Sequence, residues 1–145
     1  MRARTVAACL TILALAMGSL LAAAPAATGS DGHKVVAYYF HGAQRCKTCL
    51  HIESTAEKVL RERFGEELRA GQLAWRTANI DRTENEHFVK DFQLVSSSVV
   101  LVELDGEKQV RFKVLDKVWQ LARDDFEFEA YVGRETAAFL KNARG

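Results

Sequence analysis

The sequence predicts an α/β domain with one mixed four-stranded sheet and helices on both of its faces. In the first half of the chain, strand-like segments alternate with amphipathic helical segments, which favours parallel strands joined by helical crossovers. Farther along, Asp105-Gly106 separates two more strand-like segments, and this dipeptide is typical of a tight turn between antiparallel strands. The predicted order is therefore β-α-β-α-β-β-α, with no repeat and no internal linker.

The bounds of these elements follow from hydrophobic periodicity and from turn residues. The segment KVVAYYF (34–40) is β-branched and aromatic, as expected of a buried strand. Gly65 is expected to end the helix that follows the cysteine pair, and Thr83 with Glu86 has the spacing of a capping box that opens a short helix. In chain order we expect a strand at 34–40, a helix from the cysteine pair to Phe64, a strand at 73–80, a helix at 83–92, strands at 99–104 and 108–115, and helical segments over 116–141.

Apolar residues at helical spacing define the predicted core side of two of these helices. In the short helix this side consists of Phe88, Val89 and Phe92. The last helical segment is expected to break near Asp124. Its core-facing residues are predicted to be Val118, Leu121, Phe128, Tyr131, Val132, Phe139 and Leu140.

The first 26 residues differ in composition from the rest of the chain. Arg2 and Arg4 precede an apolar run over 6–21, and small residues that include Ala24 and Ala26 follow it. This pattern is typical of a cleaved secretory signal peptide over residues 1–26. An uncleaved N-terminal membrane anchor is the alternative, because the apolar segment is nearly long enough to span a bilayer. Both interpretations predict that the domain, residues 33–145, is exported to a periplasmic or other extracytoplasmic location.

Charge and cysteine content narrow the function classes. The formal net charge is +1 with both signs interspersed, so the basic stripe expected of a nucleic-acid-binding protein is missing. Of the three cysteines, Cys9 lies in the predicted leader, which leaves Cys46 and Cys49 as the only pair in an exported domain. Disulfides form in such compartments, so the pair is a candidate redox-active disulfide.

Cys46 and Cys49 stand where thiol–disulfide exchange requires them. Cys46 precedes a predicted helix, and the unpaired N–H groups and macrodipole of a helix N-terminus stabilise a thiolate. Arg45 and Lys47 add positive charge on either side. Cys49 lies one turn farther in, within disulfide reach and more buried, which suits a resolving thiol. We therefore expect Cys46 to attack, as the more reactive thiol, and Cys49 to resolve.

A C-x-x-C motif at the start of a helix after the first core strand, in this element order, resembles the thioredoxin fold. The resemblance covers about Val35 to Leu140, and FQLVSSSVVLVELDGE (92–107) is similar to the thioredoxin segment that leads into the third core strand and its hairpin. More narrowly, YYFHG…RC…C…IE together with HFVKDFQL is similar to the small exported thioredoxin-like proteins of the ArsF type.

This resemblance implies a thiol–disulfide oxidoreductase that uses its redox-active disulfide and needs no bound cofactor. Its partners would be proteins or small molecules that carry a disulfide or a dithiol. Proteins of the ArsF type are often encoded beside a membrane protein of the CcdA/DsbD-like class, so the resemblance also implies a membrane electron donor of that class.

Three positions depart from the thioredoxin pattern. Lys47-Thr48 stands in place of the usual Gly-Pro, and Arg45 in place of the usual tryptophan. Ser98 aligns with the cis-proline that packs against the disulfide in thioredoxins, and the only proline in this chain is Pro25 in the leader. The residues expected to shape the site are therefore Arg45, Lys47, Thr48 and Ser98, with His41 at the end of the first strand.

Two other interpretations of the cysteine pair remain open. Two thiolates suit soft ions such as copper(I) or zinc, so the domain could be a non-enzymatic module that captures a soft metal or an arsenical. A closed zinc site needs four ligands, however, and only His41 among the histidines is expected near the pair, so no metal-ligand set is predicted. An inert structural disulfide is the other alternative, although so short a loop removes little unfolded-state entropy.

Glu53 is a candidate proton acceptor. The position of the acid that thioredoxins bury beside the resolving cysteine is occupied here by Tyr39 or Phe40. Glu53 falls one turn beyond Cys49 on the apolar stripe of the predicted helix, with no cation one turn away on that helix. Burial without a partner would raise the carboxyl pKa and let Glu53 take the proton of Cys49. The alternatives are that Glu53 reaches solvent or pairs with a basic side chain of another element.

Overall fold

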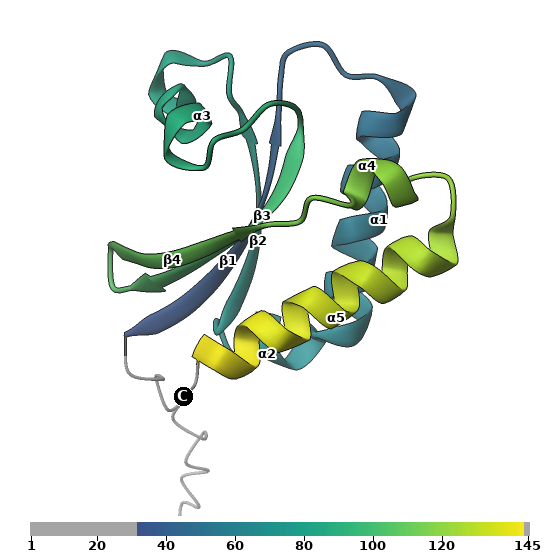
Figure 1. The fold of residues 1–145 in the computed structure, drawn as a ribbon. Helices are drawn as coiled ribbons and strands as arrows, with labels where there is room; N and C mark the ends of the chain where they lie inside the picture. Colours follow the sequence, from purple (N-terminus) through teal and green to yellow (C-terminus); the bar gives the residue numbers. More distant parts are fainter. Residues whose placement is uncertain (1–31, 144–145) are drawn as a thin grey trace, which may run out of the picture.

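The computed structural model describes residues 32–143 (Figure 1). The predicted signal peptide and its alternative, the N-terminal anchor, fall on residues 1–26 and lie outside the described part of the chain. Among residues 32–143, no helix has both the length and the apolar character needed to cross a membrane.

Four strands form one mixed sheet in the order β2-β1-β3-β4. β1 pairs in parallel with β2 and antiparallel with β3, and β3 pairs antiparallel with β4 across the turn at Asp105-Gly106. The strands span His33–His41 (β1), Leu73–Asn79 (β2), Ser98–Asp105 (β3) and Lys108–Val114 (β4). The predicted mixed sheet, with its parallel first pair and its antiparallel hairpin, is confirmed.

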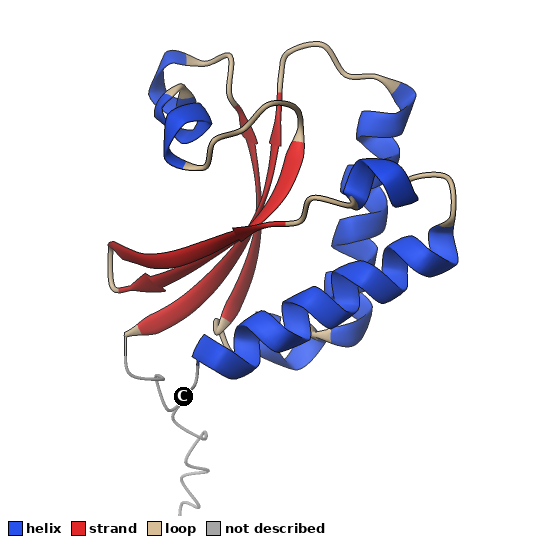
Figure 2. Cartoon of the chain, in the orientation of Figure 1, coloured by secondary structure: helices blue, strands red, loops and turns tan. Residues whose placement is uncertain are grey.

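Helices cover both faces of this sheet (Figure 2). α1, α2, α4 and α5 lie on one side, and α3 lies on the other (Figure 1). The helices span Lys47–Arg63 (α1), Gly65–Arg69 (α2), His87–Asp91 (α3), Val118–Leu121 (α4) and Asp125–Ala143 (α5), with a 3₁₀ turn, η1, at Thr83–Asn85. Element order, strand order and strand direction together make this a thioredoxin-like α/β fold, as the sequence predicted.

Alternation along β1 divides the core into two parts. Val35, Ala37 and Tyr39 are buried in the larger part, which packs against α1 and α5. Phe40 points the other way and packs with Phe92 in the smaller part, under α3. Because successive side chains of a strand point to opposite faces, one continuous apolar segment serves both layers.

The first helix ends within one residue of its predicted end, but Gly65 does not end it. α1 ends at Arg63, and Phe64 serves both as its C-cap and as the N-cap of α2, which begins at Gly65. The backbone leaves the helical region at Phe64 (φ −128°, ψ 30°), and the Phe64 side chain is buried in the larger core. The turn is therefore made at a buried phenylalanine, and the glycine continues into a new helix.

The capping box predicted at Thr83 is not formed. Thr83 begins η1, whose N-cap is Arg82 without a side-chain cap bond, and α3 begins only at His87. Val89 was predicted to lie in the core, but it is exposed, because a five-residue helix turns only one narrow side to the sheet. Phe92, just beyond the helix, is buried as expected.

The predicted break near Asp124 is confirmed, and it has a local cause. The Oδ1 atom of Asp124 accepts a hydrogen bond from the backbone N–H of Glu127 (3.1 Å), and the N–H of Phe128 donates to the Asp124 carbonyl (2.9 Å). Asp124 therefore caps the first turn of α5. The predicted core-facing residues of this segment are buried, with Leu121 only partly so.

Candidate disulfide site

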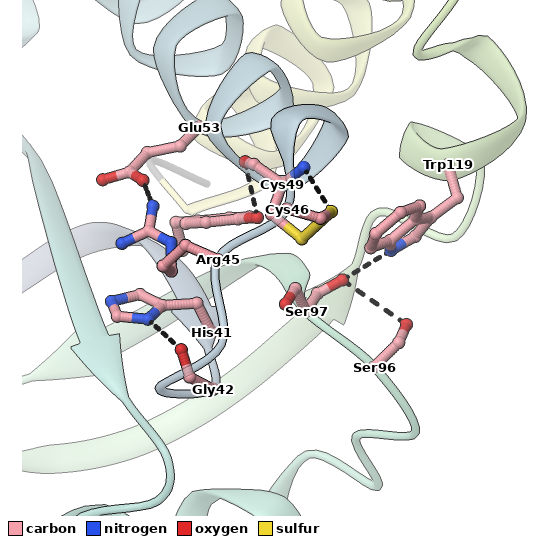
Figure 3. The surroundings of a disulfide bond; sticks show 10 residues. His41, Gly42, Arg45, Cys46, Cys49, Glu53, Ser96, Ser97 and Trp119 are labelled. Atoms are coloured by element: carbon pink, nitrogen blue, oxygen red, sulfur yellow. Dashed lines mark hydrogen bonds and ion pairs between the residues drawn. A yellow bond between two sulfur atoms is a disulfide. The ribbon is translucent and has the colours of Figure 1, made fainter.

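The site lies where β1 ends and β3 begins. These ends adjoin because the two strands are antiparallel, with Phe40 opposite Ser98. The loop that leaves β1 after His41 leads directly to α1, and the loop before Ser98 arrives beside it (Figure 3). Two segments far apart in the sequence thus meet at one edge of the fold.

Cys46 and Cys49 form a disulfide at the N-terminus of α1. Cys46 is the N-cap residue, and its Sγ accepts a hydrogen bond from the backbone N–H of Cys49 at 3.0 Å. The N–H of Leu50 donates to the Cys46 carbonyl at 3.1 Å. Sulfur therefore takes the place of the side-chain oxygen that usually accepts at a helix start, facing amides that have no partner within the helix.

The two cysteines differ in access to solvent. Cys46 is exposed, whereas only 6% of the surface of Cys49 is accessible. Lys47 and Thr48, which lie between them on the first turn, are both exposed. A thiol or disulfide that approaches from solvent therefore meets Cys46 first.

The loop before Cys46 is tied to the loop after β2. Asp81 accepts a hydrogen bond from the backbone N–H of Ala43 through Oδ2 (2.6 Å), and the N–H of Ile80 donates to the His41 carbonyl (2.9 Å). Gly42 lies at the closest approach, because a Cβ there would be 3.1 Å from the same Asp81 oxygen. Asp81 was not recognised from the sequence, where it directly follows the strand predicted at 73–80.

His41 lies at the end of β1, half-buried, with its Nδ1 atom 2.8 Å from the Gly42 carbonyl oxygen. In Figure 3 it sits beside Arg45. His51 has a different environment, because its Nε2 atom is 2.9 Å from Asp125 of α5. Among residues 32–143, no three His, Cys, Asp or Glu side chains are grouped closely enough to hold a metal ion.

The loop before β3 is held by side-chain hydrogen bonds to its carbonyl groups. Ser98 is buried at the start of β3, and its hydroxyl donates to the Ser96 carbonyl (2.9 Å). The indole Nε1 of Trp119, on α4, donates to the Ser97 carbonyl (2.7 Å). No cis peptide bond occurs within residues 32–143. The sequence did not identify Trp119 as part of the site, since a lone tryptophan in a helical pattern does not indicate a site.

Glu53 is not the unpaired carboxylate that the helical pattern suggested. Its Oε2 atom forms an ion pair with Nη2 of Arg45, which lies in the loop before α1 and not on the helix (Figure 3). The side chains of Glu53 and Arg45 are 21% and 25% exposed, so the pair lies at the margin of the core. A neighbouring guanidinium favours the ionised carboxylate, which opposes the desolvation on which the sequence-based expectation relied.

Tyr39 joins the sheet to Cys49. Its side chain is fully buried, and its hydroxyl donates a hydrogen bond to the Cys49 carbonyl at 2.8 Å. Burial raises the pKa of Tyr39, while a hydrogen bond with the Ser97 side chain and the charge of Arg45 act in the opposite direction. The sequence identified Tyr39 only as an apolar replacement for an acid. Its inward-facing place in the strand alternation was the signal that could have found it.

Fold and site together define a thioredoxin-like domain with a disulfide at the start of its first helix. No protein-family model matches the chain, and no curated protein matches it either. Among solved structures, Fasciola hepatica thioredoxin is 14% identical, with a TM-score of 0.39 over 70% of this chain and 80% of that chain. The germline-specific thioredoxin protein Deadhead of Drosophila melanogaster is 16% identical, with a TM-score of 0.38 over 65% of this chain and 80% of that chain. At these values the likeness does not extend to activity, and the fold assignment rests on the strand order and directions described above.

Proposed function

We propose that the protein is a thiol–disulfide oxidoreductase in which Cys46 attacks and Cys49 resolves. The observation that carries the proposal is the pairing of an exposed cysteine at the N-cap of α1 with a buried cysteine one turn farther along. A disulfide that only stabilised the fold would gain little from closing so short a loop.

In the reductive direction, the Cys46 thiolate attacks one sulfur of a partner disulfide. A bond forms between Cys46 and that sulfur, and the other partner sulfur leaves as a thiolate. Cys49 then loses its proton and attacks Cys46, which restores the Cys46–Cys49 bond and releases the second partner thiolate. The partner gains two electrons and the cysteine pair loses two. The oxidative direction is the reverse.

Several groups support the attacking thiolate. The Cys49 N–H already points at the Cys46 sulfur at 3.0 Å, and it would donate more strongly to a thiolate, because a charged acceptor forms the stronger hydrogen bond. The macrodipole of a 17-residue helix favours negative charge at the same place. Arg45 and Lys47 flank Cys46 in the chain and add positive charge. We also propose that His41, at the end of β1, and Ser98, at the start of β3, shape the site.

Glu53 remains our candidate acceptor for the Cys49 proton. Its partial burial and its position one turn beyond Cys49 support this role. The ion pair with Arg45 adds a second role, because the same carboxylate holds the residue that precedes the attacking cysteine.

We further propose that the protein acts after export and receives electrons from a membrane protein of the CcdA/DsbD-like class. The composition of residues 1–26 and the likeness of the C-x-x-C segment to proteins of the ArsF type support this assignment. The oxidoreductase needs no bound cofactor, since the electrons pass through the disulfide itself.

The test is a redox titration in mixtures of reduced and oxidised dithiothreitol, with thiols counted by alkylation, together with an assay of insulin disulfide reduction. We expect a reversible two-electron couple and catalysis that is lost in Cys46→Ser. Cys49→Ser should accumulate a mixed disulfide. Retained activity in Cys46→Ser would overturn the proposal. So would a tight, stoichiometric zinc or copper(I) complex of the reduced protein without turnover, which would favour metal capture.

A further inference from the structure

The hydroxyl of Tyr39 has a place in the site that the two cysteines alone do not explain. Tyr39 lies on β1, which is paired on both sides by β2 and β3, and its ring is buried in the larger core. Only its hydroxyl reaches beyond the sheet, to the carbonyl of Cys49 at 2.8 Å. A buried polar group of this kind is normally satisfied by partners, and the group that accepts the proton of this hydroxyl is the backbone carbonyl of Cys49.

Opening the disulfide removes the covalent tie on the first turn of α1. In a mixed disulfide, the partner also pulls on Cys46, which is the exposed N-cap residue. Farther along the helix, Ile52 and Ala56 are fully buried and hold α1 to the core. At Cys49 itself, the hydrogen bond from Tyr39 comes from a different element, so breaking the sulfur–sulfur bond does not by itself remove it.

We infer that Tyr39 is a positioning residue for the resolving step. Its hydroxyl holds the backbone of Cys49, so that the Cys49 sulfur stays within reach of Cys46 while the mixed disulfide exists. The inference rests on the proposed function and deepens it. In this step Cys49 gives up its proton, its thiolate bonds to Cys46, and the bond from Cys46 to the partner breaks with the electron pair leaving on the partner sulfur. No atom of Tyr39 enters the reaction.

Burial and hydrogen bonding agree with this role. Because burial raises the pKa of Tyr39, the phenol keeps its proton where cysteine thiolates form, and it remains a donor throughout. Proximity contributes strongly to intramolecular reactions, and small losses of alignment are costly. The resolving step is such a reaction, whereas the first attack brings two separate molecules together and does not need the Cys49 thiol.

The test follows both steps in one reaction. Reduced full-length protein, with Cys9→Ser in every sample so that Cys46 and Cys49 are its only thiols, is mixed in a stopped-flow instrument with dithiobis-nitrobenzoate, a symmetrical disulfide whose thiol product is coloured. The first attack releases one equivalent of the coloured thiol, and resolution releases the second. In Tyr39→Phe we expect the first release to be unchanged and the second to be about three- to tenfold slower, as for the loss of one buried hydrogen bond.

Tyr38→Phe is the matched control. It removes a hydroxyl from the adjacent position of β1, where the ring stacks on Phe40 on the other face of the sheet (5.1 Å between centroids). Both releases should remain at the wild-type rates in this variant. As a second measurement, the equilibrium of the cysteine pair with glutathione should shift toward the reduced form in Tyr39→Phe by the same factor as the second release.

The possible results distinguish a failure of this inference from a failure of the proposed function. An unchanged second release in Tyr39→Phe, or equal slowing of both releases, would show that Tyr39 has only a structural role and would overturn the inference. Failure of the wild-type protein to release a second equivalent would instead overturn the proposed oxidoreductase, whatever the variant does.

Discussion

Arg45 and Glu53 form an ion pair that joins the loop before α1 to the second turn of that helix, beside the disulfide. The pair ties the residue next to Cys46 to the residue one turn beyond Cys49. Arg45 also lies over the ring of Tyr39, with its guanidinium carbon 5.9 Å from the ring centroid. Arg45 therefore links the loop before α1 both to Glu53 of that helix and to the buried ring of Tyr39.

Replacing the guanidinium should make Cys46 less reactive. In Arg45→Met, one positive charge beside the thiolate is lost while most of the side-chain volume stays. The pH at which alkylation of Cys46 reaches half its maximal rate is expected to rise, because the thiolate loses a stabilising charge. Lys58→Met is the control, since Lys58 lies on the same helix and pairs with Glu129 of α5. If Lys58→Met raised this pH by as much as Arg45→Met, the proposal that Arg45 stabilises the Cys46 thiolate would be wrong.

The two roles of Glu53 can be separated kinetically. In Glu53→Gln we expect the first attack by Cys46 to be nearly unchanged and the resolving step to slow, because a carboxamide cannot accept a proton. The double variant with Arg45→Met distinguishes the causes. If its resolving step is as fast as that of Arg45→Met alone, Glu53 acts only by holding Arg45, and the proton-acceptor role is wrong.

Asp81 should stabilise the loop that leads to Cys46. In Asp81→Ala the backbone N–H of Ala43 loses its acceptor, and we expect unfolding in urea to become easier by about 1–2 kcal/mol. Asp81→Asn keeps a carbonyl oxygen at this position and should recover most of the loss. Asp91→Ala, a change at an exposed residue of α3, is the control. A loss no larger than the control would show that the loop does not depend on this bond.

A second ion pair holds the opposite end of the sheet. Glu103 on β3 is 6% exposed at its side chain and pairs with Arg111 on β4, which also donates to the Phe139 carbonyl of α5 (2.9 Å). Breaking a fully buried pair costs about 3–5 kcal/mol. Because the Arg111 side chain is 34% exposed, solvent screens part of the attraction between the two charges. We therefore expect Arg111→Met to lower the free energy of unfolding by about 2 kcal/mol. The redox equilibrium of the distant cysteines should not change. A shift in that equilibrium would indicate that the two ends are coupled.

Tyr131 should contribute to stability in a defined alkaline range. Burial and a hydrogen bond to Asp116 (2.8 Å) raise the pKa of Tyr131 to about 12, from a usual value of 10.0. The folded state therefore keeps a proton that the unfolded state has lost, so this contribution is complete below about pH 10 and disappears as the pH rises toward 12. Urea titrations between about pH 10 and 12 should show that the free energy of unfolding declines less with pH in Tyr131→Phe than in the wild type. An equal decline in the two proteins would show that the proton on Tyr131 does not contribute to stability.

Features that depend on local pattern were predictable from the sequence. The buried strand at β1, the Asp105-Gly106 turn and the helix break at Asp124 each follow from a few neighbouring residues. The place of the cysteines at the start of α1 was predictable for the same reason. The failure at Thr83 shows the limit, because a capping-box spacing occurs there without the helix that it should begin.

Contacts between distant segments were not predictable in the same way. The partner of Glu53 was missed because Arg45 belongs to a loop and not to the helix. The path of that loop depends on Asp81, which is distant in the sequence. Tyr39 was interpreted from the sequence as an apolar residue because of its ring. Its hydroxyl finds the Cys49 carbonyl only when α1 packs over β1. Trp119 reaches the Ser97 carbonyl only because α4 packs beside the loop before β3.

The position of the chain ends has a consequence for tethering. β1 begins at His33 and runs for nine residues, roughly 30 Å, before the chain turns toward the cysteines. The C-terminal end of α5 lies at the same end as His33, near the pair of Glu103 and Arg111 (Figure 1). An attachment at either end of the described chain, to a surface, a bead or a lipid layer, would therefore leave the disulfide on the far side, facing outward. Immobilised protein should accordingly react with dissolved disulfides as readily as free protein does.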